Sequence, residues 1–198
     1  MRKVLFTALA GIISTMGLGW AASADGITVG GQAEGFTLND VRTGQPVSLS
    51  DFQDARGVAV IFIATQCPYS NAFNHVMADL AQKYESRGIV FLGINPNKTE
   101  PASEVLTHAD QHGLKFTVLK DEGHVVADRF GATVTPEVFL LDANWKVVYH
   151  GALGNSRQPT ADASQANGDE LTAALEAFLA GEPIERSTTK MFGCTIKR

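Results

Sequence analysis

The chain has only two cysteines, Cys67 and Cys194, among 198 residues, which is too few for a fold built on several disulfides. It also has no repeat, no biased tract and no block of basic residues, and its formal net charge is −5. These absences exclude collagenous and coiled-coil proteins, and they argue against a surface that binds the phosphates of nucleic acid. Hydrophobic residues make up 44% of the chain and charged residues 19%, which is typical of a globular protein.

The first 24 residues have the pattern of a secretory signal peptide. Arg2 and Lys3 precede an apolar stretch from Val4 to about Leu18, and Ala22-Ser23-Ala24 follows it. A membrane anchor is the alternative, but glycines and hydroxyl residues interrupt the stretch, which falls short of the roughly 20 residues that a span needs. We therefore expect cleavage after Ala24, no membrane span in the remaining chain, and a periplasmic or secreted protein, in which a disulfide can persist.

Apolar patterning predicts one α/β domain over residues 25–181, followed by a tail, residues 182–198, that carries Cys194. The runs Gly57–Ala64 and Ile89–Ile94 are continuous and rich in β-branched residues, as in strands that are buried on both faces. Helices are expected at 68–88 and 101–113, as a short helix that ends at 131, and around 171–178. Further strands are expected at 36–38, 47–49, 116–119, 138–141 and 146–149, and a long loop at 152–168. This order predicts a layered sandwich with parallel strands in its first half and an antiparallel pair near its end.

Cys67 lies where the first buried strand ends and a helix begins. The free N–H groups and the positive dipole end of a helix N-terminus favour a thiolate over a thiol. A small buried hydrophobe is the alternative, because many free cysteines have that role. The position at the carboxyl end of a strand, where open sheets bind ligands, favours a nucleophile instead.

Three segments resemble the thioredoxin superfamily. Phe62–Ser70 is similar to its active-site strand, turn and helix, and Val134-Thr135-Pro136-Glu137 is similar to its cis-proline loop. Val29-Gly30-Gly31 with residues 36–38 and 47–52 resembles the N-terminal hairpin of the redoxin branch, the alkyl hydroperoxide reductase/thiol-specific antioxidant group, in its peroxiredoxin-like subgroup. The resemblance extends from about Val29 to about Leu179.

This resemblance implies a thioredoxin-like three-layer α/β/α sandwich with a mixed central sheet and an N-terminal β-hairpin. It also implies a thiol oxidoreductase whose nucleophile, Cys67, attacks a peroxide or a disulfide and is restored by a thiol reductant. Thr135 and Pro136 would shape the substrate face, and Thr65 and Ser70 would orient the sulfur. No cofactor and no metal are implied, and the sequence carries no prediction of oligomeric state.

Two departures separate the chain from its better-known relatives. Thioredoxins carry Cys-x-x-Cys, but position 70 is Ser, so no exchange within the motif can occur, although a serine hydroxyl can donate a hydrogen bond to a thiolate. Peroxiredoxins carry Pro-x-x-x-Thr-x-x-Cys, whereas this chain has Val60 and Ala64 at those positions, with Thr65 one place closer to the cysteine.

Four interpretations of Cys194 stay open at the level of sequence. It resolves an oxidised Cys67, forms a permanent bridge with it, joins it as a second sulfur ligand of Cu(I) in a copper carrier, or pairs with another chain. Gly193 beside it indicates a close backbone approach.

The remaining candidates carry weaker signals. His108 and His112 are spaced to share one helix face, and a solvated face is favoured over a metal site because no third ligand is near. His75, His124 and His150 are isolated. Glu137 follows Pro136 and is expected either near the Cys67 sulfur, where it would oppose ionisation, or in solvent.

Overall fold

The computed structural model describes residues 26–154 and 166–198. The predicted signal peptide and most of the predicted loop at 152–168 lie outside these residues. The elements along the chain are β1 (Thr37–Asp40), β2 (Pro46–Ser48), a 3-10 helix (Leu49–Phe52), β3 (Gly57–Phe62), α1 (Pro68–Ala72), α2 (Asn74–Glu85), β4 (Ile89–Asn95), α3 (Ala102–Gln111), β5 (Thr117–Lys120), α4 (Val125–Phe130), β6 (Val134–Thr135), β7 (Glu137–Asp142), β8 (Val147–Gly151), α5 (Asp169–Ala180) and β9 (Cys194–Thr195).

Seven strands form one mixed sheet in the order β2-β1-β5-β4-β3-β7-β8. The strands β3, β4 and β5 are parallel, and β7 runs antiparallel to both β3 and β8. The hairpin of β1 and β2 joins the sheet through an antiparallel pairing of β1 with β5. The predicted mixed sheet and N-terminal hairpin are therefore confirmed.

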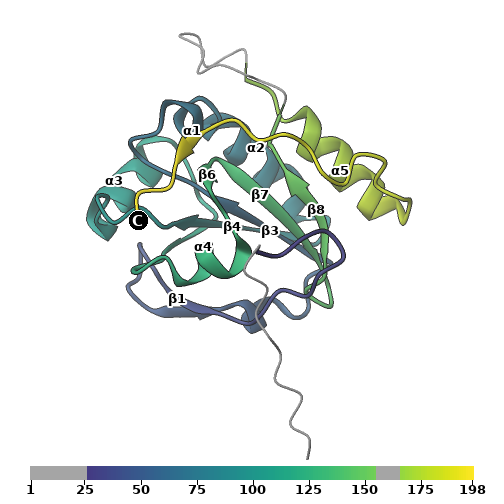
Figure 1. Cartoon of the computed structure of the whole chain (residues 1–198), viewed down its shortest axis with the longest axis horizontal. Helices are drawn as coiled ribbons and strands as arrows, with labels where there is room; N and C mark the ends of the chain where they lie inside the picture. The colour runs from purple at the N-terminus through teal and green to yellow at the C-terminus, as the bar shows by residue number, and fades with distance from the viewer. Residues whose placement is uncertain (1–25, 155–165) are drawn as a thin grey trace, which may run out of the picture.

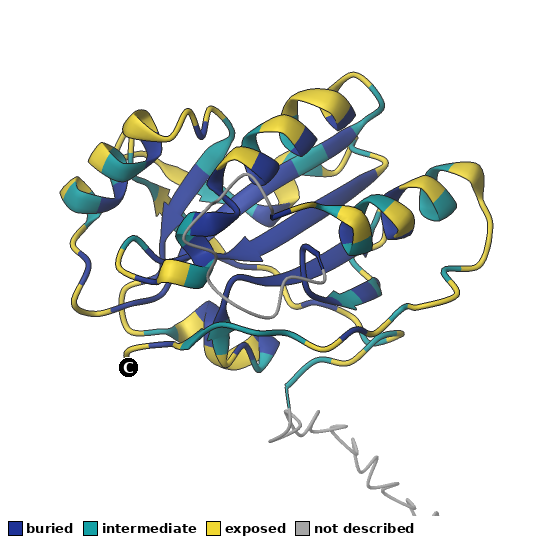
Figure 2. Ribbon diagram, turned by 90° about the horizontal axis from the view of Figure 1, so that it is seen from above, coloured by how far each residue is buried: buried dark blue, intermediate teal, exposed yellow. Residues whose placement is uncertain are grey.

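Alternate residues of the central strands enter two separate cores, as the period of a strand requires. On one face, Ala59 and Ile61 of β3 pack in a core with residues of α2, α3 and α5. On the other face, Val58 and Val60 pack in a second core with residues of α4 and the N-terminal segment. Figure 2 shows the result, with buried strands between helices whose outer faces are exposed. The three-layer sandwich follows from this division.

The helix predicted from Pro68 to Gly88 is two helices. The helical conformation is interrupted at Phe73, which has φ −97° and ψ 2°. Phe73 ends the short helix α1 and precedes α2. The break lets the Phe73 ring enter the core, where it is 4% exposed, and lets the buried Asn74 amide reach His108 on α3 at 3.0 Å. Cys67 therefore precedes a five-residue helix and not a long one.

The tail packs against the domain along most of its length, and in Figure 1 it runs from the end of α5 across to the side where α3 lies. Thr189 is buried, and its hydroxyl bonds both the Tyr149 hydroxyl and the Ala152 N–H. Further along, β9 pairs with β6, a pairing that sequence analysis did not predict, and Ile196 is buried in the second core.

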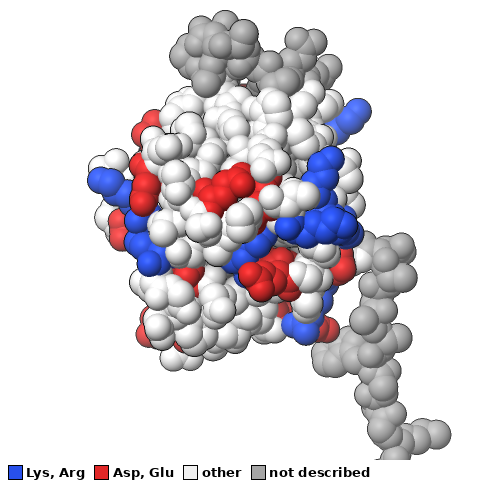
Figure 3. Space-filling view, turned by 90° about the vertical axis from the view of Figure 1, so that its left-hand side faces the viewer, with Lys and Arg blue, Asp and Glu red and all other residues white. Residues whose placement is uncertain are grey.

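Within the described residues, no helix is long and apolar enough to cross a membrane. On the face shown in Figure 3, acidic and basic side chains lie next to one another, without an extended surface of one sign.

We expect Thr189→Val to lower the free energy of unfolding by about 1–3 kcal/mol, because the isosteric valine leaves the buried Ala152 N–H without an acceptor. Urea unfolding measures the change. Thr107→Val is the matched control, since the exposed Thr107 hydroxyl donates only to a carbonyl of its own helix. Equal stability of the two variants would show that the tail is not anchored at Thr189.

Candidate active site

Cys67 caps the N-terminus of α1 immediately beyond the sheet. Its thiol donates to the Thr135 carbonyl at 3.1 Å, and its sulfur accepts the Ser70 N–H at 3.4 Å. The residue is only 2% exposed. The sulfur is therefore held between the first turn of a helix and the loop that precedes β7.

That loop contains a cis peptide bond between Thr135 and Pro136, as the resemblance implies. Thr135 ends β6, and it lies directly opposite Cys194 in the antiparallel pairing of β6 with β9. Cys67 contacts the same Thr135 through its carbonyl. One residue of the cis-proline loop thus contacts both cysteine-bearing segments.

Cys194 is partly exposed, and both cysteines are free thiols in the structure. Burial raises the pKa of the Cys194 thiol to about 11, and a hydrogen bond and charge repulsion from the Cys67 sulfur act in the same direction. The Tyr69 N–H and the Lys197 charge oppose this rise. The Ser70 N–H binds Cys67, and the Cys67 sulfur and the Tyr69 N–H both influence the pKa of Cys194, so the two sulfurs lie near each other beside the first turn of α1.

Gly193 makes the approach of the tail possible. A Cβ atom on this residue would lie 2.2 Å from the Thr135 carbonyl oxygen, which is far inside van der Waals contact. The close backbone approach predicted from Gly193 is confirmed. Any larger residue at this position conflicts with the pairing of β9 and β6.

A buried carboxylate supports the loop that carries Cys67. Glu100, 1% exposed, accepts the backbone N–H groups of Thr65 and Gln66 at 2.8 and 3.1 Å, and the side-chain amides of Asn95 and Asn97 at 2.6 and 2.9 Å. Burial by itself raises the pKa of this carboxyl, but the hydrogen bonds outweigh burial, so that the pKa lies below the usual 4.5. Glu100 is thus charged and fully bonded beneath the active-site turn.

The same network reaches the tail. The Asn97 side-chain oxygen accepts the Lys197 N–H at 2.7 Å, and the Lys197 carbonyl accepts the Lys98 N–H at 3.0 Å. Lys120 is buried beneath and donates to the Asn95 side chain at 2.8 Å and to the Asn97 carbonyl at 2.6 Å. The two cysteine-bearing segments therefore share one polar support.

Glu137 supports the cis-proline loop in a similar way. One carboxylate oxygen accepts the N–H groups of Thr133 and Val134 at 2.9 and 3.1 Å, and the other lies 2.7 Å from His150 Nε2. Its exposed fraction is 1%, and no described hydrogen bond joins it to either sulfur. The expectation that Glu137 lies in solvent is wrong, because backbone amides and a histidine bind it inside the protein.

Thr65 and Ser70 were predicted to orient the Cys67 sulfur, but their hydroxyl groups bind other partners. The Thr65 hydroxyl donates to Glu104 at 2.5 Å, and no described hydrogen bond links it to Cys67. The Ser70 hydroxyl accepts the Ala64 N–H at 3.1 Å, and it is the Ser70 backbone N–H that contacts the sulfur. Both residues shape the turn through their hydrogen bonds to the chain around it.

Glu100 and Asn97 were not among the predicted site residues. The signal available in the sequence was the polar cluster Asn95–Glu100, which begins with the last residue of the buried strand β4, at the sheet edge where Cys67 also lies. Polar groups at that edge must be satisfied by the neighbouring turns.

The histidines stay apart from the sulfurs. His108 bonds Asn74 and contacts His112, with ring centroids 4.3 Å apart and ring planes tilted by 44°, and His112 is exposed. Across residues 26–154 and 166–198 there is no group of three or more His, Cys, Asp or Glu side chains that could hold a metal ion. Copper binding by the two sulfurs alone stays a prediction.

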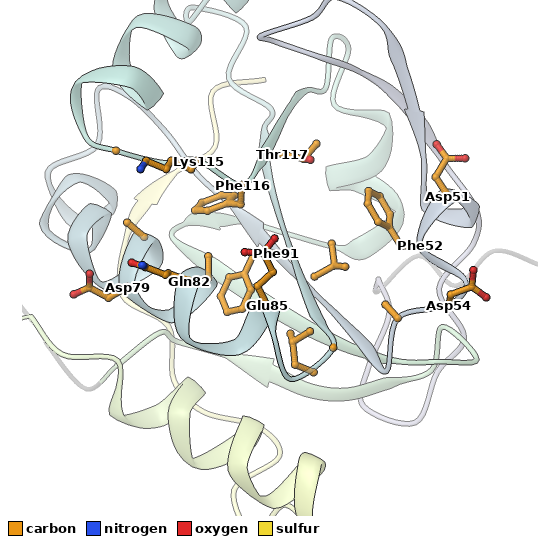
Figure 4. Close-up of a pocket in the computed structure, with 17 residues that line it drawn as sticks. Asp51, Phe52, Asp54, Asp79, Gln82, Glu85, Phe91, Lys115, Phe116 and Thr117 are labelled. Atoms are coloured by element: carbon orange, nitrogen blue, oxygen red, sulfur yellow. The ribbon is translucent and has the colours of Figure 1, made fainter.

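A cleft of about 750 Å³ lies at the other end of the sheet, where β4 and β5 begin. Figure 4 shows Phe52, Phe91 and Phe116 in its wall and Asp51 and Asp54 on one side. Cys67 follows the carboxyl end of β3, so this cleft is separate from the cysteines.

The fold, the buried cysteine at a helix start and the cis-proline loop define a thioredoxin-like thiol redox protein. Comparison with known families is more specific: residues 29–150 match the AhpC/TSA family, and the chain belongs to that family. It is a thiol oxidoreductase of the redoxin type, as the sequence predicts.

Individual relatives agree with this assignment. The thiol-disulfide oxidoreductase ResA of Bacillus thuringiensis is 28% identical over 74% of this chain and 83% of its own length. The chloroplastic peroxiredoxin Q of Sedum lineare is 30% identical over 60% of this chain and 65% of its own length. The crystal structure of a hypothetical protein from Sinorhizobium meliloti superposes with a TM-score of 0.80 at 31% identity, covering 86% of this chain and 94% of that one.

We expect Glu100→Gln to lower the free energy of unfolding by about 3 kcal/mol at neutral pH, because an amide cannot accept all four hydrogen bonds. The pKa of Glu100 is lower in the folded protein than in the unfolded chain. The charged carboxylate therefore stabilises the fold at every pH above the pKa of the unfolded chain. This contribution is lost as the pH falls through the pKa of the folded protein. The stability difference between wild type and variant should therefore narrow below pH 4.5.

Urea unfolding at several pH values measures this difference, and Glu104→Gln is the control because Glu104 accepts only side-chain hydrogen bonds at this turn. A difference that is independent of pH would mean that the charge of Glu100 does not support the turn.

Proposed function

We propose that Cys67 is the nucleophile of an exported thiol oxidoreductase and that Cys194 is its resolving cysteine. The observation that carries the proposal is that both cysteines meet at Thr135. The Cys67 thiol donates to the Thr135 carbonyl, and Cys194 lies opposite Thr135 in the pairing of β6 with β9, close enough for the Cys67 sulfur to raise the pKa of Cys194. A resolving thiol must reach the oxidised sulfur without a large rearrangement. The position of Cys194 meets this requirement, although 127 residues separate it from Cys67 in the chain.

With a hydroperoxide, the Cys67 thiolate attacks the terminal oxygen, the O–O bond breaks, and the alcohol leaves after taking up a proton. Cys67 becomes a sulfenic acid. The Cys194 thiolate then attacks that sulfur, the S–O bond breaks, hydroxide leaves and is protonated to water, and a Cys67–Cys194 disulfide remains.

With a disulfide substrate, the Cys67 thiolate attacks one sulfur and releases the other as a thiolate. Cys194 then attacks Cys67 in the mixed disulfide and releases the second substrate thiolate. Both routes end in the same internal disulfide, and an external thiol returns it to the reduced form. Ser70 cannot resolve either intermediate, because its hydroxyl is not a redox group.

Thr135 and Pro136 would shape the face that the substrate meets, since the Thr135 carbonyl binds the Cys67 thiol and Pro136 follows it through the cis peptide bond. The Thr135 hydroxyl is buried without a hydrogen-bond partner among the described residues.

We also propose export, on the signal-peptide pattern that ends at Ala24. In an oxidising compartment the internal disulfide persists until a dedicated thiol reduces it. The N-terminal sequence of the protein recovered from its native host tests this proposal: Asp25 is expected as the first residue, and a cytoplasmic protein that retains Met1 would contradict it.

We expect one equivalent of hydrogen peroxide to convert the wild-type protein to the Cys67–Cys194 disulfide. Cys194→Ser should accumulate a sulfenic acid on Cys67, because nothing resolves it, and Cys67→Ser should react with peroxide far more slowly. Dimedone labelling with peptide mass spectrometry assigns each product. Labelling of Cys194 in the Cys67→Ser variant, at the rate seen for Cys67 in Cys194→Ser, would contradict the assignment of the nucleophile.

A further inference from the structure

The cleft where β4 and β5 begin has the size of a small-molecule site. Its volume is about 750 Å³, and pockets that hold small ligands measure roughly 300–1,000 Å³. Residues of the 3-10 helix, of α2 and of the first parts of β4 and β5 line it (Figure 4). The proposed thiol chemistry does not use this cleft, because Cys67 lies beyond the opposite end of the sheet.

Aromatic side chains form much of the apolar wall of the cleft. Phe91 is 3% exposed, whereas Phe52 and Phe116 are partly exposed. The rings of Phe91 and Phe116 pair with centroids 6.3 Å apart and planes tilted by 51°. Aromatic faces in such a hollow can contact both the apolar part and a cationic group of a ligand.

One face of α2 keeps the cleft open. Ala78, Ala81, Gln82 and Glu85 follow the spacing of a single helix face, and all four line the cleft. Both alanines are partly exposed. A longer apolar side chain at Ala78 or Ala81 would enter the space, so the small side chains on this face preserve a concave apolar surface.

The charged residues that line the cleft are mostly acidic. They are Asp51, Asp54, Asp79, Glu85 and Lys115. Figure 4 shows Asp51 and Asp54 on the side of the cleft opposite Asp79. In the part of the chain that the structure describes, no hydrogen bond or ion pair engages the carboxylates of Asp54, Asp79 or Glu85. These carboxylates are therefore open to a cationic partner from both sides of the apolar wall.

We propose that this cleft binds a small organic dication, a molecule with an apolar middle and a cationic group at each end. The apolar middle contacts the phenylalanines and alanines, and the cationic groups meet Asp54 on one side and Asp79 on the other. Charge complementarity selects this class, because an anionic ligand would be repelled by the carboxylates. The site goes beyond the proposed function, since neither cysteine lines the cleft.

Isothermal titration calorimetry with three probes of equal chain length tests the proposal. These probes are 1,8-diaminooctane with two charges, octylamine with one and 1,8-octanediol with none. We expect the diamine to bind the full chain with one-to-one stoichiometry and the diol to bind about tenfold more weakly, with octylamine between them. Added sodium chloride should weaken binding of the diamine and leave binding of the diol unchanged.

Paired variants locate the site. Asp54→Asn combined with Asp79→Asn should weaken diamine binding about tenfold. Glu182→Gln combined with Glu185→Gln is the matched control, because it changes the net charge equally at exposed positions outside the cleft. This control should bind the diamine with wild-type affinity.

A second pair of variants tests the apolar wall. Ala81→Phe should abolish binding of all three probes, because the ring fills the space beside α2. Ala180→Phe, at an exposed position near the end of α5 and outside the cleft, should bind them as the wild type does. Circular dichroism and thermal unfolding establish that each variant is folded.

Equal affinity of the wild-type protein for the diamine and the diol, or no binding of the diamine, would overturn the proposal. Wild-type affinity in the folded Asp54→Asn/Asp79→Asn or Ala81→Phe variant would place the diamine elsewhere and overturn it as well. Cys67→Ser should bind the diamine as the wild type does. Failure of the proposed thiol chemistry therefore leaves this result unchanged and is distinguishable from failure of the cleft.

Discussion

The pairing of β9 with β6 is the contact on which the redox account depends. It joins the tail to the cis-proline loop at Thr135 and Cys194, and Thr135 also accepts the hydrogen bond of the Cys67 thiol. Without this pairing, Cys194 would not lie near Cys67, and β9 would not help to bury Cys67. Position 70 is Ser and not the second cysteine of the thioredoxin motif, and this contact brings a second thiol near Cys67 from the tail.

Two buried carboxylates hold the two loops that meet at the sulfurs. Glu100 accepts two consecutive backbone N–H groups from the turn before Cys67, and Glu137 accepts two from the loop before Pro136. The pKa of Glu100 is lowered by its hydrogen bonds, and bonds to a charged acceptor are stronger than neutral ones, so the turn before Cys67 is well supported. Asn97 then fixes Lys197 of the tail to the same support. The turn before Cys67 and the cis-proline loop are therefore both held by buried carboxylates, and the tail packs against them from outside.

Features that depend on long residue patterns could be predicted from the sequence. Continuous apolar runs predicted β3 and β4, and motif resemblance predicted the cis-proline loop and the family. The pairing of β6 with β9 could not be predicted, because two-residue strands have no periodicity. The break at Phe73 depends on tertiary packing that overrides helix propensity. The buried role of Glu100 likewise depends on which loops the fold brings together, and the Thr65 hydroxyl turns to Glu104 and not to the sulfur for the same reason.

The central claim, that the fold holds the two sulfurs together, is tested most directly by the effective concentration of Cys194 toward Cys67. Equilibration of the protein with glutathione redox buffers measures it, first under native conditions and then in denaturant. The account predicts a native value at least about a hundredfold above the denatured one, since folding removes the cost of closing a loop of more than a hundred residues. Equal values in the native and the denatured protein would contradict it.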